Sequence, residues 1–147
     1  MIRLATHDDV EKSVEIGIKF AQDSYYGTMP IDPQKMLDMA DWAVEAPDWL
    51  YLVSEEDGEQ VGFFSAYLDT SMFGPAVIAM QHLMYILPEH RHGMTAVRFL
   101  KEFEKWAREV GADNLYFATS AFVDERFHAL AERLGFDYIG PQFGKKL

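Results

Sequence analysis

MYILPEHRHGMTAVRFL, residues 84–100, carries the strongest structural signal in this chain of 147 residues. An apolar run ends at Pro88, a basic turn follows, and a helical pattern begins with small residues near Thr95. Because the first N–H groups of a helix lack partners within it and point outward, such a turn is suited to a phosphate. The stretch fits equally well an ordinary strand-turn-helix connection with a solvated basic face, and spacing alone does not separate the two interpretations.

Periodicity on both sides of this stretch predicts one α+β domain, residues 1–147, built on a mixed sheet. The predicted order is β-α-α-β-β-β-α-β-α-β-β. Asp57-Gly58 lies between apolar runs at 49–54 and 60–68, which is a strong signal for a β-hairpin. The other strands are expected at 2–5, 76–87, 115–119, 136–139 and 142–146, and the helices at 7–22, 34–46, 95–110 and 124–134.

Composition places the chain among ordinary globular proteins, with 49% apolar and 25% charged residues. The absence of cysteine excludes a disulfide framework, a thiolate nucleophile and a cysteine metal site. No apolar run approaches the ~20 residues that span a bilayer, and no leader-like segment precedes the first strand, so we expect a cytoplasmic protein. The net charge of −11 argues against nucleic acid and anionic membranes as partners.

The negative charge is confined to one half of the chain. Residues 1–69 hold 15 acidic and 4 basic side chains, which accounts for all of it, whereas residues 70–147 hold 9 of each. A solvated acidic face that keeps the protein soluble explains this distribution. An acidic surface that attracts a polyamine, a basic peptide or a basic protein explains it too.

A strand followed by V-x-P-x-x-R/Q-x-x-G-x-G/A and an amphipathic helix is the coenzyme A signature of the GNAT N-acetyltransferases, and residues 84–100 resemble it. Ile86, Pro88, Arg91 and Ala96 match the signature in register, and Met94 stands where its central glycine belongs. The resemblance covers essentially the whole chain, including the RLGF segment at 133–136. The turn after the strand and FEKWA at 103–107 look most like the short GNAT proteins of phage and prophage genomes.

The resemblance implies acetyl-CoA as the acetyl donor and identifies the residues that would hold it. The strand backbone would pair with pantetheine, and the turn and the first helical amides would hold the pyrophosphate. Asp124 stands where the family has a cofactor-binding asparagine. The residues implied for the coenzyme are Met84, Tyr85, Ile86, Arg91, His92, Gly93, Met94, Thr95, Ala96, Val97 and Asp124.

Two positions depart from the family's pattern. Met94 keeps the N–H donor but adds bulk where glycine lets a phosphate approach, so we expect weaker coenzyme binding. Ala131 stands where the family has the tyrosine that protonates the departing thiolate, a loss that could reduce the rate ~10²–10⁴-fold. A thiol with a pKa of roughly 8.5 is a tolerable leaving group without an acid, so this loss need not abolish turnover.

Acetyl transfer to an amine also benefits from a general base. His82 lies in the strand that would hold the thioester, and an ordinary pKa of about 6.5 suits the task. His128, one helical turn before Ala131, and Tyr138 are candidates for the missing acid. Packing roles explain each of these residues as well. The histidines show no metal-ligand spacing, and we predict no metal.

Aromatic residues in loops are the candidates for contact with the acceptor. Most aromatic side chains belong to cores, but Tyr25, Tyr26 and Phe73 fall in predicted loops, the first two where GNAT proteins line the acceptor pocket. The sequence does not name the acceptor. Dimers are common among the proteins that this one resembles, so a homodimer is one expectation.

Two functions therefore stand beside each other. The first is an acetyl-CoA-dependent N-acetyltransferase in which a primary amine attacks the thioester directly in a ternary complex. The second is a GNAT-like protein of little or no turnover, encoded by a phage, that binds acyl-CoA or a host protein. Met94 and Ala131 favour the second, while the intact Arg91 turn and His82 favour the first.

Overall fold

A mixed five-stranded sheet with helices on both faces organises the computed structural model, which describes residues 1–91, 93–118, 125–140 and 143–147. The strands are β1 (Ile2–Leu4), β2 (Trp49–Glu56), β3 (Glu59–Thr70), β4 (Val77–Ile86) and β5 (Asn114–Tyr116). The α-helices are α1 (Val10–Gln22), α2 (Pro33–Glu45), α3 (Thr95–Glu109) and α4 (Glu125–Arg133). Short 3₁₀ turns form η1 (His7–Asp9), η2 (Tyr25–Thr28) and η3 (Pro88–His90).

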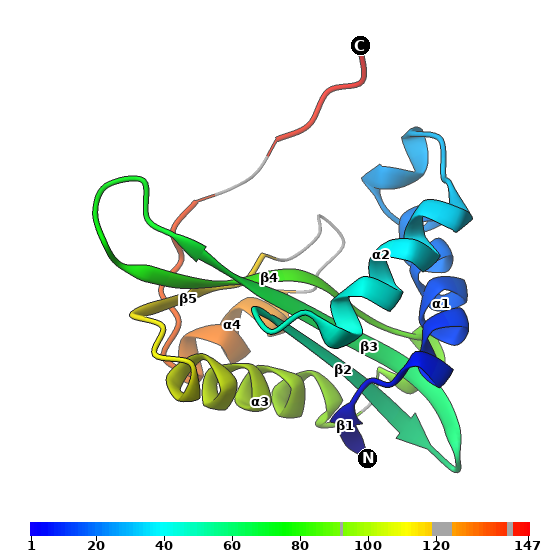
Figure 1. Ribbon diagram of the computed structural model, residues 1–147, viewed down its shortest axis with the longest axis horizontal. Coiled ribbons are helices and arrows are strands. Elements are labelled where there is room, and N and C mark those ends of the chain that lie inside the picture. The colour runs from blue at the N-terminus through cyan, green and yellow to red at the C-terminus, as the bar shows by residue number, and fades with distance from the viewer. Residues whose placement is uncertain (92, 119–124, 141–142) are drawn as a thin grey trace.

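The strands lie in the sheet in their order along the chain, β1 to β5 (Figure 1). The first four pair antiparallel, and β5 pairs parallel to β4 after the crossover through α3. This arrangement confirms the predicted mixed sheet. The β2–β3 connection is the predicted Asp-Gly hairpin, in which Asp57 and Gly58 have φ angles of 50° and 83°. Positive φ at both central residues fits the right-handed twist of the flanking strands.

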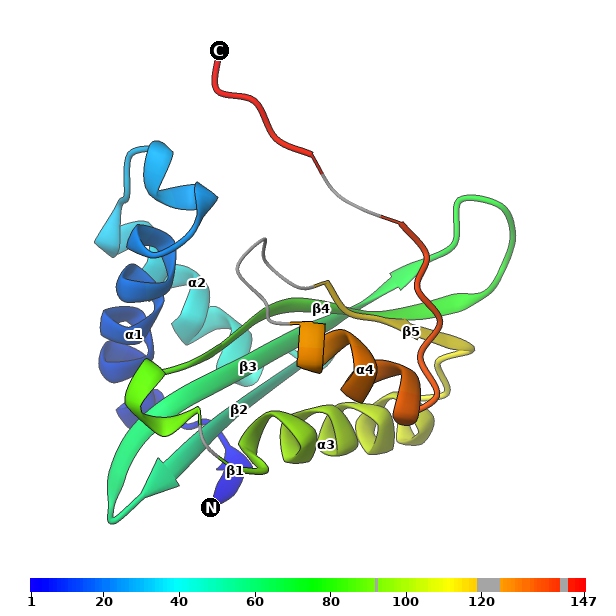
Figure 2. The ribbon, with the colours of Figure 1, turned by 180° about the vertical axis from the view of Figure 1, so that it is seen from behind.

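Each face of the sheet packs against its own pair of helices, and Figure 2 shows the face opposite to that in Figure 1. Helices α1 and α2 cover one face, where Phe63 and Tyr85 belong to the core. Helix α3 covers the other, where Phe64, Phe99 and Phe103 are fully buried, and α4 lies alongside α3 in both views. Since neighbouring residues such as Phe63 and Phe64 serve opposite cores, the alternation along each strand positions both layers.

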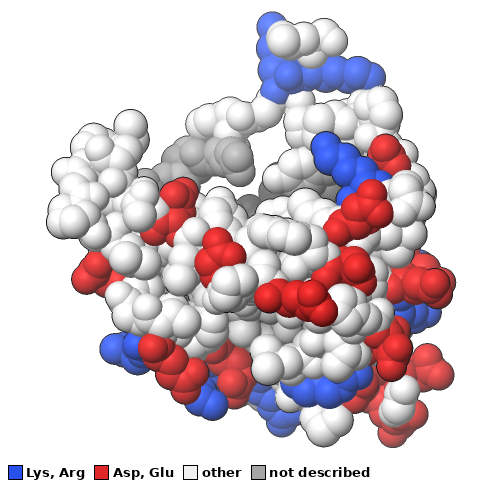
Figure 3. All heavy atoms as spheres, in the orientation of Figure 1, with Lys and Arg blue, Asp and Glu red and all other residues white. Residues whose placement is uncertain are grey.

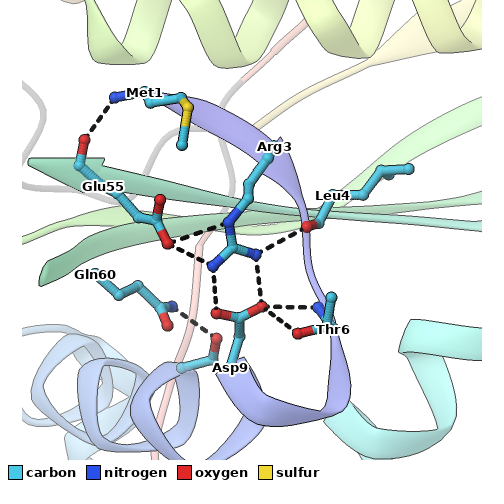
Figure 4. A network of polar contacts seen from close by, with 8 residues as sticks. Met1, Arg3, Leu4, Thr6, Asp9, Glu55 and Gln60 are labelled. Carbon is cyan, nitrogen blue, oxygen red and sulfur yellow. Dashed lines mark hydrogen bonds and ion pairs between the residues drawn. The ribbon is translucent and has the colours of Figure 1, made fainter. Parts of the chain in front are cut away.

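An ion-pair network ties β1 to the start of α1 (Figure 4). The guanidinium of Arg3 donates to both oxygens of Asp9, at 2.7 and 2.8 Å, and to Glu55 of β2. Asp9 also accepts the backbone N–H of Thr6 at 2.7 Å and thereby caps the turn η1. The Arg3 hydrogen bonds and the capping bonds hold the pKa of Asp9 down to about 2.

Three predicted strands differ in the structure. Strand β5 covers 114–116 and so includes only two residues of the expected 115–119, and no strand occurs in the described parts of 136–139 and 142–146. Tyr138 and Ile139 are 70% and 74% exposed. A short alternating pattern forms a strand only where a partner supplies a ladder, and none of the described strands runs beside these residues. Among the described helices none is both long enough and apolar enough to span a membrane.

Candidate functional site

Strands β4 and β5 pair over three residues and then separate. Their register ends at Met80 opposite Tyr116, while β4 continues along β3 as far as Ile86. At the point of separation the side chain of Gln81 accepts the N–H of Ala118 at 2.9 Å, in place of a backbone partner. Beyond it, no described strand lies beside the edge of β4 that faces away from β3.

Two residues on this edge present backbone groups to the open side. The N–H of Leu87 bonds to the carbonyl of Val61 on the β3 side at 2.9 Å. Since the hydrogen-bonding direction alternates along an antiparallel strand, the groups of Ile86 and Met84 point away from β3. The backbone of Tyr85 points toward β3, so Met84 and Ile86 are the residues of the predicted trio that can pair with a ligand along this edge.

A β-bulge lies at the start of the open edge. Ser65 of β3 is opposite Leu83 and Ala66 is opposite Gln81, which leaves His82 as the extra residue on β4. A bulge bends the strand and redirects side chains from strict alternation. His82 and Leu83 accordingly both line the same cavity beneath α1 and α2.

That cavity has a volume of about 50 Å³ and is mostly apolar. The lining residues with polar groups in their side chains are Ser13, Trp49, Tyr51, Ser65 and His82, and the described lining contains no carboxylate. The Oγ of Ser65 lies 3.2 Å from Nδ1 of His82. The rings of Trp49 and Tyr67 lie 5.2 and 6.5 Å from the imidazole, both edge-on. Burial lowers the pKa of His82, which favours the neutral imidazole.

The N-terminus of α3 is the second part of the site. The helix's own hydrogen bonds begin with Arg98, whose N–H donates to the carbonyl of Met94 at 2.9 Å, so the N–H groups of Thr95, Ala96 and Val97 precede that ladder. Met94 caps the helix without a side-chain hydrogen bond, and no acidic residue occupies the first turn. Gly93, at φ 121°, has open space where a Cβ would stand. Together these features fit an anion at this helix start.

Arg91 connects the turn to β4. Its Nε donates to the carbonyl of Ile86 at 2.8 Å, and its guanidinium carbon lies 4.8 Å from the centre of the Tyr85 ring. The carbonyl of Ile86 is therefore already bonded, which leaves the N–H of Ile86 and both groups of Met84 on the open edge. The Tyr85 hydroxyl donates to Oδ2 of Asp23 at 2.8 Å. Burial and the Asp23 carboxylate raise the pKa of this phenol.

The structure does not bring the three predicted acid–base residues together. His82 lines the cavity on the α1–α2 side, whereas His128 is exposed on α4, on the α3 side of the sheet (Figure 2). The ring of Tyr138 lies 6.4 Å from that of His128. His92 and Asp124, predicted to bind the coenzyme, lie outside the described residues.

The three predicted acceptor residues also separate into two groups. Tyr25 and Tyr26 lie on η2 beside the end of α1, with the Tyr26 ring 5.9 Å from that of Phe20. Gly144 passes so close that a Cβ there would be 2.8 Å from a ring carbon of Tyr25. Phe73, 93% exposed, is in the β3–β4 loop, which both ribbon views show far from η2.

Sequence reasoning missed Ser65 and Asp23. Ser65 is 4% exposed in a strand, and its contact to His82 depends on a cross-strand register that no local pattern records. Asp23 follows α1 as one of many acidic residues, and only the fold brings Tyr85 to it. The periodicity of β3, in which Phe63 and Ser65 share a face, could have identified Ser65 as inward-facing.

Many acidic groups of residues 1–69 have partners within the fold. Asp9 and Glu55 bind Arg3, Asp41 and Glu45 bind His7, and Glu15 binds Lys12. Figure 3 still shows acidic side chains outnumbering basic ones over α1 and α2. The outer surface of α1 and α2 is therefore acidic, while the cavity beneath these helices is mostly apolar. The described residues contain no group of three or more His, Asp or Glu side chains placed to hold a metal ion.

Comparison with known proteins gives a family and a fold. The model of the acetyltransferase (GNAT) family matches residues 18–136. An aminoglycoside acetyltransferase from an uncultured soil metagenomic sample superposes with a TM-score of 0.72 at 17% identity, covering 100% of this chain and 97% of its own. The ribosomal-protein-alanine N-acetyltransferase of Brucella melitensis biovar Abortus 2308 gives 0.70 at 17%, with 100% and 99% covered.

A predicted acetyltransferase from Clostridium acetobutylicum, solved with acetyl-CoA, gives a TM-score of 0.77 at 15% identity. The alignment covers 99% of this chain and 95% of that one. No curated protein matches the sequence. At these identities the solved structures establish the shared fold, and the family model establishes the family.

Proposed function

We propose that this chain, which belongs to the acetyltransferase (GNAT) family, transfers an acetyl group from acetyl-CoA to a primary amine by direct attack in a ternary complex. The separation of β4 from β5 after Met80 carries the proposal, because it leaves an edge of β4 that no described strand borders. This edge lies next to a half-buried histidine and leads to a helix start whose N-cap residue makes no side-chain hydrogen bond. An acyl donor supplies a thioester carbonyl, and this edge offers N–H groups to polarise it.

The residues of this chain divide the binding of the coenzyme between two elements. The carbonyl of Met84 and the N–H of Ile86 would pair with the pantetheine amides, and the N–H groups of Thr95, Ala96 and Val97 would hold the pyrophosphate. Arg91 fixes the turn between the two elements through its bonds to β4. These residues suit an extended ligand that bears phosphates, since the described donors are backbone N–H groups on a strand edge and at a helix start.

His82 is the proposed general base. The attacking amine nitrogen forms the C–N bond, its proton passes to the imidazole, and the C–S bond breaks to release the thiolate. The N–H of Met84, two residues along the open edge, is the proposed donor to the oxyanion. The lowered pKa of His82 keeps the base unprotonated at neutral pH. Release of a thiolate without a dedicated acid is consistent with alanine at position 131.

The proposed acceptor is a primary amine on a cationic small molecule or a basic peptide. The acidic excess of residues 1–69, over α1 and α2, supports a cationic molecule. Two structural neighbours are described as acetyltransferases of aminoglycosides and of a ribosomal protein's alanine, which supports an amine. Tyr25 and Tyr26 of η2 follow the end of α1 and are the proposed contacts for such an acceptor.

Calorimetric titration with acetyl-CoA, followed by a thiol-release assay against polyamines, aminoglycosides and lysine peptides, tests the proposal. We expect binding, amine-dependent release of thiol, and a loss of about 10²-fold or more in kcat for His82→Gln with unchanged coenzyme binding. Binding without release for any amine would instead favour the acyl-CoA-binding protein. Absence of binding overturns both functions. Preference for acidic amines over cationic ones overturns the acceptor class alone.

A further inference from the structure

Within the described part of the chain, Ser65 is the only residue whose side chain forms a hydrogen bond with His82. It is 4% exposed on β3, and its Oγ lies 3.2 Å from Nδ1 of His82. The bulge at His82 makes this contact possible. Ser65 is opposite Leu83 in the register, and His82, as the extra residue, lines the same cavity as Ser65 and Leu83. A regular ladder would place His82 on the face opposite to Leu83.

A neutral imidazole carries its proton on one nitrogen and accepts at the other. To accept a proton at Nε2, His82 must hold its own proton at Nδ1, and the group beside Nδ1 must then accept that proton. A serine hydroxyl is able to do so, since its oxygen has two lone pairs. When the hydroxyl accepts, Nδ1 carries the proton and Nε2 is the basic nitrogen of the imidazole.

We propose that Ser65 is a positioning residue for His82: it accepts the hydrogen bond of Nδ1–H and leaves Nε2 as the proton acceptor. This inference rests on the proposed function. Trp49 and Tyr67 restrict the imidazole ring by edge contacts, but neither offers a bond that selects a tautomer in the described structure. Ser65 is the residue that distinguishes the two nitrogens.

The surroundings of His82 make the effect of Ser65 measurable. Among the described residues, the other titratable groups near it are Tyr67 on β3 and Tyr51 on β2, and burial raises the pKa of the Tyr51 phenol. Helices α1 and α2 contribute Ser13 and apolar side chains to the cavity, with no charged group in the described lining. A change in the titration of His82 is therefore attributable to its hydroxyl partner.

The direction in which Ser65→Ala changes the pKa of His82 follows from the hydrogen bonding of the imidazolium form. Both nitrogens of the imidazolium donate, so a hydroxyl that accepts from Nδ1 stabilises it. Ser65→Ala removes this acceptor and lowers the pKa of His82 further. The acidic limb of the kcat/KM profile then moves to lower pH, by about half a unit. The plateau falls about tenfold because the base is weaker and the ring is free to change tautomer.

The experiment compares Ser65→Ala with Ser65→Thr, His82→Gln and Ser54→Ala. Ser54 is a matched control: it is a strand serine, 2% exposed, whose Oγ has no hydrogen-bond partner among the described residues. We expect Ser65→Thr to restore the wild-type pH profile and Ser54→Ala to retain it. Nitrogen-15 spectra of the imidazoles, assigned with His82→Gln, should show the proton of His82 on Nδ1 in the wild-type protein.

A wild-type spectrum with the proton on Nε2 overturns the role of Ser65, and so does a wild-type pH profile for Ser65→Ala. Either result leaves the proposed function in place as long as His82→Gln is impaired. Full activity of His82→Gln at every pH overturns the assignment of the base itself. The spectrum does not depend on turnover, so the tautomer is tested even if no acceptor amine has been found.

Discussion

Tyr85 donates its phenolic hydrogen to Asp23, 62 residues earlier in the chain, across 2.8 Å. The bond joins the open edge of β4 to the residue that ends α1, and η2 with Tyr25 and Tyr26 follows directly. This hydrogen bond therefore links the proposed coenzyme edge to the proposed acceptor loop.

Tyr85→Phe tests this connection. The ring contacts to Phe20 and Arg91 remain, while the bond to Asp23 is lost, at a cost of about 1 kcal/mol in the free energy of unfolding. We expect faster amide exchange in residues 23–28 and a higher KM for the amine with little change in kcat. Tyr67→Phe is the control, since no hydrogen bond of its hydroxyl occurs among the described residues. Equal exchange in both variants would contradict the connection.

Asp9→Asn tests the network at the start of α1. Because the folded pKa of about 2 lies below the ordinary value of 3.8, the carboxylate stabilises the fold above about pH 4, and this contribution is lost as the pH falls toward 2. The variant should lose about 2 kcal/mol at pH 7 in urea unfolding. The difference from wild type should shrink in acid. Asp8→Asn, at the exposed neighbouring position, should stay within a few tenths of a kcal/mol.

His7→Gln tests an exposed histidine between two carboxylates. Nδ1 lies 2.5 Å from Asp41 and Nε2 lies 2.9 Å from Glu45, and these contacts raise the pKa of His7. Since a raised pKa means that the charged form is favoured in the folded state, the stabilisation is present below about pH 6.5 and is lost as the pH rises through the folded value. At about pH 5.5 the variant should melt at a lower temperature than wild type. At about pH 9 the two proteins should melt at the same temperature. High salt should weaken the difference, and a difference that grows with pH would contradict the sign.

Met94→Gly tests the departure at the helix start. Met94 is 55% exposed, and its φ of −102° places no demand on glycine, so the substitution acts chiefly by removing bulk beside the N–H groups of α3. We expect the Kd for acetyl-CoA in calorimetry to fall, with a cost to stability of at most a few tenths of a kcal/mol. Gly93→Ala should instead raise the Kd for acetyl-CoA, because a φ of 121° strains any residue with a Cβ. An unchanged Kd for Met94→Gly would show that the side chain turns away from the ligand.

Local sequence patterns predicted correctly those elements whose conformation depends on interactions between residues close together in the chain. The Asp-Gly hairpin formed as expected because both residues tolerate the positive φ that a two-residue turn requires. Helix α3 begins at Thr95 as expected and ends at Glu109, shortly before Gly111, since its apolar spacing and the glycine that follows it are properties of the segment itself. The expected strands near the C-terminus did not form in the described residues, because a strand needs a neighbour that its own sequence does not contain.

The candidate site also combines features that the local sequence predicts with features that depend on tertiary contacts. A basic turn between a strand and a helix, with uncapped N–H groups, could be predicted from residues 84–100 because every part of it is contiguous. The partner of His82 could not, because a bulge of one residue places the imidazole against Ser65, 17 positions away. The opposite placement of His128 depends on which face of the sheet α4 occupies, and helical periodicity carries no such information.

The sequence by itself determined the kind of protein this is: an acidic α+β chain whose residues 84–100 resemble a motif of its family, because periodicity, turn residues and motif spacing are local properties. Only the tertiary structure decided where β4 leaves β5, which backbone groups that exposes, and which hydroxyl faces the histidine. These relationships come from strand register and packing between segments far apart in the chain. Each depends on contacts whose free energy exists only once both segments are in place.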